Sequence, residues 1–91
     1  MSAAVAVTVE FYGIPRRRAR RAELSVPAAT VAEALAAVTR ACPELGDLVR
    51  GDGRLSPHFL ISLNGREFVT DLGQALRPAD RILLLSADAG G

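Results

Sequence analysis

Hydrophobic and polar residues alternate along several short stretches of the chain, a two-residue period typical of β-strands with one buried face. The first stretch places Val5, Val7 and Val9 on one face, and Thr8 and Glu10 on the other. Alternation or a short apolar run recurs four more times. The sequence therefore predicts five strands, at residues 4–12, 20–26, 58–64, 66–69 and 81–86.

The apolar period changes between the second and third predicted strands. Thr30 and Glu33 have the T-x-x-E spacing of a capping box, which satisfies free backbone N–H groups at a helix start. Residues 31–41 repeat apolar side chains at helical spacing, and Pro43 cannot continue the helix. We expect an amphipathic helix over residues 31–41, with one further helical turn in the segment that begins at Pro43.

Glycine, proline and asparagine mark the turns between the strands. Residues 13–18 include Pro15 and are predicted to form a turn that joins the first two strands as an antiparallel hairpin. Asn64 and Gly65 both tolerate positive φ, so they predict a second hairpin before the short fourth strand.

The order strand, strand, helix, strand, strand, strand predicts an α+β domain. One main helix would pack across one face of a mixed sheet of four to five strands, with the last or the third strand parallel to the first. This order and length predict a β-grasp, or ubiquitin-like, roll over residues 1–85, followed by a flexible tail over residues 86–91. Residues 70–78 are predicted to be a connector whose Leu72 and Leu76 tuck under the sheet.

Composition narrows the class of protein. The 91 residues are 49% hydrophobic and 23% charged, with a net charge of +1, which is ordinary for one small globular domain. No apolar run approaches the roughly 18 residues that span a bilayer, and the start does not resemble a signal peptide. We therefore expect a cytoplasmic protein without a membrane partner. One cysteine, Cys42, and one histidine, His58, are too few for a zinc cage, so we expect no metal and a buried Cys42.

The sequence ends on Gly90 and Gly91, a few residues after the apolar last strand. Together with the predicted roll, the Asn-Gly hairpin and the P-x-D step at residues 78–80, this ending resembles the ThiS/MoaD family of sulfur carriers. The resemblance covers nearly the whole chain. Two features depart from it: residues 86–89 read SADA instead of a Pro-Pro or similar segment, and residues 78–80 read PAD instead of DGD.

The resemblance implies a carrier that is not itself an enzyme. A ThiF/MoeB-type activating enzyme would adenylate the Gly91 carboxylate with ATP, and sulfide or a persulfide would displace AMP to leave a thiocarboxylate. No cofactor is expected on the carrier, because ATP is used by the activating enzyme. The predicted function is sulfur donation through Gly91 to a sulfur-accepting synthase, with the MoaD-like small subunit of molybdopterin synthase as the preferred case.

Other assignments stay open at this point. The carrier could serve thiamine, cysteine, tRNA thiolation or natural-product biosynthesis. The protein could instead be a ubiquitin-like modifier that is conjugated to target lysines through Gly91, or a plain interaction module. The chain contains no lysine, which rules out side-chain-linked chains of this protein on itself but not its attachment to other proteins.

The partner is expected to contact both the tail and the sheet. In the tail, small residues and one charged residue would enter a narrow active site. In the sheet, strand alternation points three leucines away from the helix, where they form an apolar docking patch unless a loop covers them. The predicted partner-binding residues are Gly90, Ala89, Asp88, Leu60, Leu83 and Leu85.

Residues 16–21 read RRRARR and form the strongest charge run in the chain. Three interpretations remain: a solvated turn, a surface for an acidic partner, or an RNA contact. The run has no interleaved aromatic residues for base stacking, and the net charge is close to zero. Nucleic acid is therefore not an expected partner.

Overall fold

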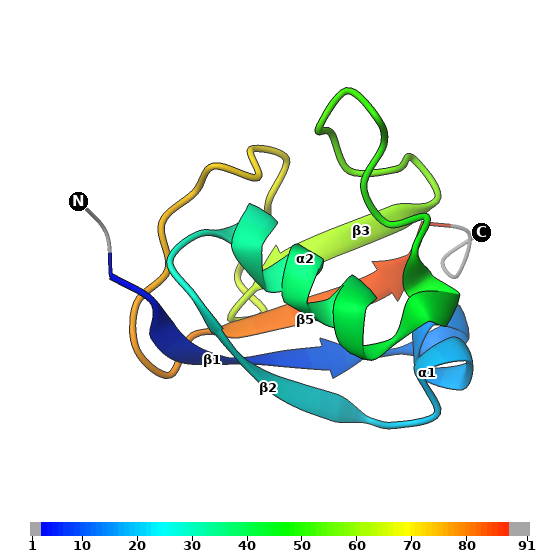
Figure 1. Ribbon diagram of the computed structural model, residues 1–91, viewed down its shortest axis with the longest axis horizontal. Coiled ribbons are helices and arrows are strands. Elements are labelled where there is room, and N and C mark those ends of the chain that lie inside the picture. Colours follow the sequence, from blue (N-terminus) through cyan, green and yellow to red (C-terminus); the bar gives the residue numbers. More distant parts are fainter. Residues whose placement is uncertain (1–2, 88–91) are drawn as a thin grey trace.

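Figure 1 shows a twisted sheet with one long helix lying across one of its faces. This computed structural model describes residues 3–87. The five strands are β1 (Val5–Phe11), β2 (Glu23–Ala28), β3 (Phe59–Leu63), β4 (Glu67–Phe68) and β5 (Arg81–Ser86). They lie in the order β2-β1-β5-β3-β4, so β5 is the central strand.

β1 and β5 are parallel, whereas the other neighbouring strands are antiparallel. Of the two placements that the sequence left open, the structure has the last strand, not the third, beside the first. The mixed sheet and the crossing helix form a β-grasp fold, which confirms the predicted α+β class.

The main helix, α2 (Val31–Ala41), covers the predicted residues, and a short 3₁₀ turn, η1 (Pro43–Leu45), follows it as expected. Thr30 Oγ1 accepts a hydrogen bond from the N–H of Glu33 at 3.3 Å. The Glu33 carboxylate accepts one from the N–H of Ala29 at 2.9 Å. The capping box is therefore present, with its second bond shifted by one residue from the usual pattern.

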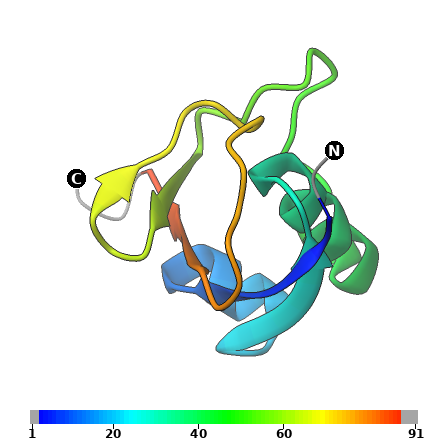
Figure 2. The same cartoon turned by 90° about the vertical axis from the view of Figure 1, so that its left-hand side faces the viewer.

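The connector between β4 and β5 completes the start of α2. The N–H groups of Val31 and Ala32 donate to the carbonyl oxygens of Gln74 and Leu72, at 3.0 and 2.8 Å. Leu72 and Leu76 are both buried, as predicted. Figure 2 shows this connector, coloured yellow to orange, in front of the sheet. Two N–H groups in the first turn of α2 thus donate to carbonyl oxygens of a segment that comes much later in the chain.

The segment 13–18, predicted to be a turn, forms a helix instead, α1 (Gly13–Ala19). The prediction was wrong because a proline in a short segment is common in turns but is not specific to them. Proline also fits the first turn of a helix, where its missing N–H is not needed. Pro15 and Ala19 lie one turn apart and are buried, so the three arginines between them face outward. β1 and β2 remain antiparallel neighbours, joined by a helix rather than by a hairpin turn.

β2 (Glu23–Ala28) begins and ends later than the predicted residues 20–26. Val26 and Ala28 are buried, whereas Ala22, which lies before the observed strand, is exposed. The shift follows from α1, because the chain must complete that helix before it can join the sheet.

The Asn64–Gly65 hairpin is confirmed, with φ of 56° and 69° at its two residues. The Asn64 side chain also joins the hairpin to the start of β5. Its Nδ2 donates to Asp80 Oδ1 at 3.0 Å, and its Oδ1 accepts from the N–H of Arg81 at 2.8 Å. Asparagine is suited to this position because it tolerates left-handed backbone and offers both a donor and an acceptor.

Leu83 and Leu84 are adjacent on β5 but lie on opposite faces, so a pair of alanine substitutions tests the face assignment. Leu84 is 0% exposed in the core, and we expect Leu84→Ala to lower the free energy of unfolding by about 3 kcal/mol. Leu83 is only half-buried, so Leu83→Ala should cost about 1 kcal/mol or less although it removes the same atoms. Urea unfolding followed by circular dichroism measures both, and equal losses would contradict the assignment.

Candidate functional site

The candidate site begins where β5 leaves the sheet. Ile82 and Leu84 are fully buried and Ser86 is almost so, which keeps the strand in the core up to its last residue. One residue further, Ala87 donates its N–H to the carbonyl oxygen of His58 at 2.8 Å. We call residues 86–87 the tail root, because the rest of the predicted tail extends from them.

The predicted tail is described only as far as this root. The predicted site residues Asp88, Ala89, Gly90 and Gly91 lie outside the described residues. What the structure defines is the position and the packing of the chain that leads to them.

The three predicted docking leucines share the outer face of the sheet, by which we mean the face opposite α2. Leu60 lies directly across from Leu85 in the β3–β5 pair, so their side chains are neighbours on one face. Leu83 lies two residues before Leu85 and therefore points to the same face. Leu60 is 39% exposed, while Leu83 and Leu85 are half-buried. The structure thus brings the three side chains together and leaves them partly open.

Phe68 extends this group and was not among the predicted site residues. It pairs with Ser62, which in turn pairs with Leu83, so the three residues form a row across β4, β3 and β5. Phe68 is 68% exposed, the largest value for a large hydrophobic side chain in residues 3–87. The signal in the sequence was the alternation within REFV, which separates Phe68 from the buried Val69. We define the outer apolar patch as Leu60, Phe68, Leu83 and Leu85.

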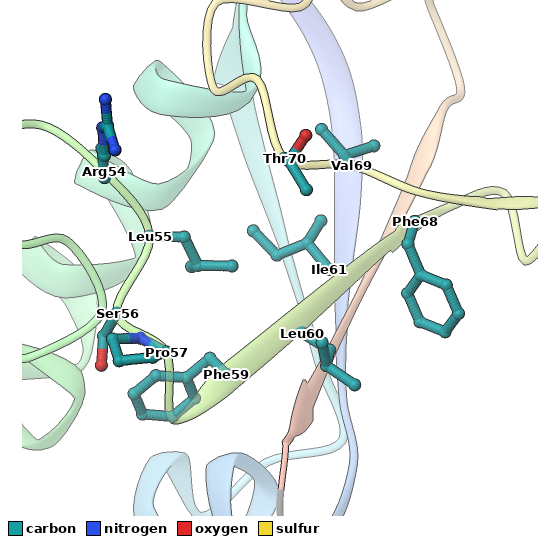
Figure 3. Close-up of a pocket in the computed structure, with 10 residues that line it drawn as sticks. All are labelled: Arg54, Leu55, Ser56, Pro57, Phe59, Leu60, Ile61, Phe68, Val69 and Thr70. Carbon is teal, nitrogen blue, oxygen red and sulfur yellow. The ribbon is translucent and has the colours of Figure 1, made fainter.

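A groove of about 510 Å³ opens beside the outer apolar patch, at the edge of the sheet. In Figure 3, Leu60 and Phe68 lie on one side of β3, and Leu55 and Ile61 lie on the other. Two members of the outer apolar patch, Leu60 and Phe68, therefore also line this groove.

A polar network borders the outer apolar patch on the β1 side. Glu10 lies opposite Leu83 in the β1–β5 pair, and its carboxylate binds Arg81 with an Nη1–Oε2 distance of 2.6 Å. The hydroxyl of Tyr12 donates to the other Glu10 oxygen at 3.2 Å. This hydrogen bond, together with desolvation and the negative charge of Glu10, raises the pKa of Tyr12 above its ordinary value of 10.0. An apolar centre with a polar border is the usual anatomy of a protein interface.

Cys42 is buried, as predicted. Within residues 3–87, no three histidine, cysteine, aspartate or glutamate side chains are grouped so that they could hold a metal ion. No helix in that part of the chain is long and apolar enough to cross a bilayer.

Solved structures that are similar to this chain are ubiquitin-like proteins. Small archaeal modifier protein 1 from Haloferax volcanii is 28% identical, with a TM-score of 0.81 over 94% of this chain and 99% of that chain. The protein of the same name from Methanosarcina acetivorans is 24% identical, with a TM-score of 0.83 over 97% and 98%. A third structure, the BexX/CysO complex from Amycolatopsis orientalis, gives 24% and 0.80 over 94% and 100%.

No protein-family model and no curated protein matches the sequence. The structural matches nevertheless span nearly all of each chain. They confirm the predicted resemblance to ThiS/MoaD-type ubiquitin-like proteins. The general class is that of small ubiquitin-like carriers and modifiers.

Tyr12 is the only tyrosine in the chain, so its titration reports on the polar network directly. We expect absorbance at alkaline pH to give a phenol pKa above 10.0, because the Glu10 carboxylate favours the protonated phenol. In Glu10→Ala the pKa should fall back toward 10.0. Glu44→Ala removes an exposed carboxylate elsewhere and should leave the titration unchanged. A wild-type pKa that Glu10→Ala does not alter would show that the hydrogen bond is absent in solution.

Proposed function

We propose that this protein is a ubiquitin-like sulfur carrier, whose C-terminal Gly91 is activated and then holds sulfur as a thiocarboxylate. The observation that supports this most is the ending of β5. The central, most enclosed strand of the sheet leads into the tail root at Ala87, and a Gly-Gly pair ends the sequence four residues later. The structural similarity to small archaeal modifier protein 1 and to the CysO of the BexX/CysO complex supports the same class.

The chemistry follows from the ordinary properties of a carboxylate. A free C-terminal carboxyl has a pKa of about 3.3–3.7, so at neutral pH it is an anion and a poor electrophile. An oxygen of this carboxylate attacks the α-phosphorus of ATP, pyrophosphate leaves, and an acyl-adenylate forms. Hydrosulfide then attacks the acyl carbon, the C–O bond to the phosphate breaks, and AMP leaves with that electron pair. The product is a thiocarboxylate, which keeps sulfur nucleophilic and attached to a protein.

The tail root suits delivery of this group into a narrow active site. Four residues follow Ala87, and a fully extended segment of that length spans at most about 14 Å. The folded domain would therefore stay outside the partner's active site. The last three residues of the tail are alanine and glycine, whose small or absent side chains would fit a narrow channel. In this proposal the protein contributes no catalytic group of its own, and the ThiF/MoeB-type activating enzyme supplies ATP chemistry in the cytoplasm.

The outer apolar patch would provide the second contact with the partner. Leu60, Phe68, Leu83 and Leu85 form one partly open surface with a polar border, on the face that the core does not use. Burying such a group contributes affinity, mainly through a few large side chains near its centre. Docking by the patch and insertion of the tail together would hold Gly91 in place for the reaction.

A second function uses the same activated tail. In a protein modifier, a lysine amine of a target attacks the activated Gly91 carbonyl, and an isopeptide bond forms. The similarity to a protein named as a small archaeal modifier favours this candidate specifically. Among sulfur acceptors, the large subunit of molybdopterin synthase stays the preferred prediction, with thiamine, cysteine, tRNA-thiolation and natural-product enzymes as alternatives.

Intact mass spectrometry of the protein from its native host tests the carrier. We expect a fraction of molecules to show an oxygen-to-sulfur mass increase that fragmentation places at Gly91. Deletion of Gly91 should abolish it, because the reacting carboxylate is displaced by one residue, while the Arg66→Gln control keeps it. Peptides branched from target lysines and carrying this tail would identify the modifier instead. If protein that ends on Gly91 yields neither product, both functions are contradicted.

A pair of charge insertions tests the outer apolar patch. Leu60→Asp with Phe68→Asp should raise the KM of the carrier in ATP–pyrophosphate exchange by the activating enzyme of its host about tenfold or more, because two apolar contacts are lost. The matched control, Ala32→Asp with Ala36→Asp, adds the same charge to the exposed side of α2. The patch is not a docking surface if both double variants give the same KM.

A further inference from the structure

The arginines of residues 16–21 are concentrated on the outside of one short helix. Arg16, Arg17 and Arg18 lie on α1, and Arg20 and Arg21 follow it directly; all five are exposed. Arg18 binds both carboxylate oxygens of Asp47 at 3.2 Å, which holds α1 against the segment after η1. Within residues 3–87, no ion pair joins the other four arginines to an acidic group. Their charges are therefore available to another molecule.

These charges lie at the end of the molecule from which the tail extends. α1 sits beside the end of β5 in Figure 1, and the N–H of Tyr12, at its N-cap, donates to the carbonyl oxygen of Leu84 at 3.0 Å. A hollow of about 300 Å³ is lined by Ile14 and Arg18 of α1 together with Ser86 of the tail root. The sequence did not reveal this proximity, because positions 18 and 86 are brought together only by the fold.

The distribution of charge makes this end distinct from the rest of the protein. Residues 16–21 hold five of the eleven arginines and no acidic residue. The rest of the chain holds six arginines against ten acidic residues, a surplus of four negative charges. A net charge of only +1 therefore combines a positive segment, residues 16–21, with a negative surplus over the rest of the chain. A molecule with charge distributed in this way is oriented by the field of a charged partner.

We propose that Arg16, Arg17, Arg20 and Arg21 bind an acidic protein surface that surrounds the entrance through which the activating enzyme takes the tail. This inference rests on the proposed function. The planar guanidinium group of arginine matches a carboxylate with two parallel hydrogen bonds, so four arginines suit a cluster of aspartate and glutamate side chains. Attraction between the two surfaces turns the tail end toward the entrance before contact and raises the association rate.

An acidic protein fits these residues better than a nucleic acid does. The segment contains no aromatic side chain on which a base could stack. The negative surplus on the rest of the molecule would oppose a long polyanion that extends beyond α1, whereas a compact acidic rim need only cover this end. Nucleic acid is kept as an outcome of the test.

The experiment measures ATP–pyrophosphate exchange by the ThiF/MoeB-type activating enzyme of the host, with the carrier as the varied substrate. We expect the fourfold variant Arg16→Gln, Arg17→Gln, Arg20→Gln and Arg21→Gln to raise the KM about tenfold at low salt, with kcat unchanged. The difference in KM between the wild type and the variant should shrink in about 0.5 M salt, because salt at this concentration screens charges that are more than a few ångströms apart. Arg18 is retained so that α1 keeps its bond to Asp47, and circular dichroism confirms that the variant folds.

The matched control replaces four exposed arginines elsewhere, Arg40, Arg50, Arg66 and Arg77, with glutamine. It removes the same net charge, and we expect at most a small rise in its KM. Equal effects in the two fourfold variants would overturn the inference, as would an unchanged KM in the α1 variant, although the proposed function would stand. No exchange with the wild-type carrier would overturn the proposed function and the inference together. Micromolar binding of a fluorescent 20-nucleotide RNA, lost in the α1 variant, would also overturn the inference and assign the arginines to nucleic acid.

Discussion

The structure depends on the position of β5 at the centre of the sheet. This strand is hydrogen-bonded to β1 along one edge and to β3 along the other, and its inner residues lie in the core beneath α2. The chain stays hydrogen-bonded one residue past the strand, because Ala87 donates its N–H to the carbonyl oxygen of His58. A tail that starts from so constrained a strand has a fixed origin relative to the sheet face and to α1. A partner that recognises those surfaces therefore also locates the tail.

Strand geometry lets β5 serve stability and recognition separately. Ile82 and Leu84 point inward and are fully buried, whereas Leu83 and Leu85 point outward and are partly open. Because successive side chains alternate between faces, the outer pair can change without leaving a cavity in the core. The same division holds on α1, where Pro15 and Ala19 are buried and the arginines between them are exposed. In both elements, the buried residues fix the place from which the exposed ones act.

Most of the fold could be predicted from the sequence, because local signals agreed with the final arrangement. The T-x-x-E box placed the start of α2 correctly, and Asn64–Gly65 placed the β3–β4 hairpin. The helix α1 was missed because Pro15 suits both a turn and the first turn of a helix, and the burial of Ala19 decides between them only through long-range packing. Phe68 was missed as a site residue since its exposure depends on pairing with β3. The proximity of the arginines to the tail root is likewise a property of the fold alone.

The parallel pairing of β1 with β5 also sets the order in which the protein can be completed. Thr8 pairs with Arg81, so β1 and β5 are neighbours in the sheet although most of the chain separates them in sequence. Contacts between such distant segments close large loops and form slowly. During synthesis, β1 and β2 emerge early but the space beside β1 stays open until the last strand is made. A chain cut short before β5 lacks the central strand of its sheet, which leaves the facing edges of β1 and β3 unpaired.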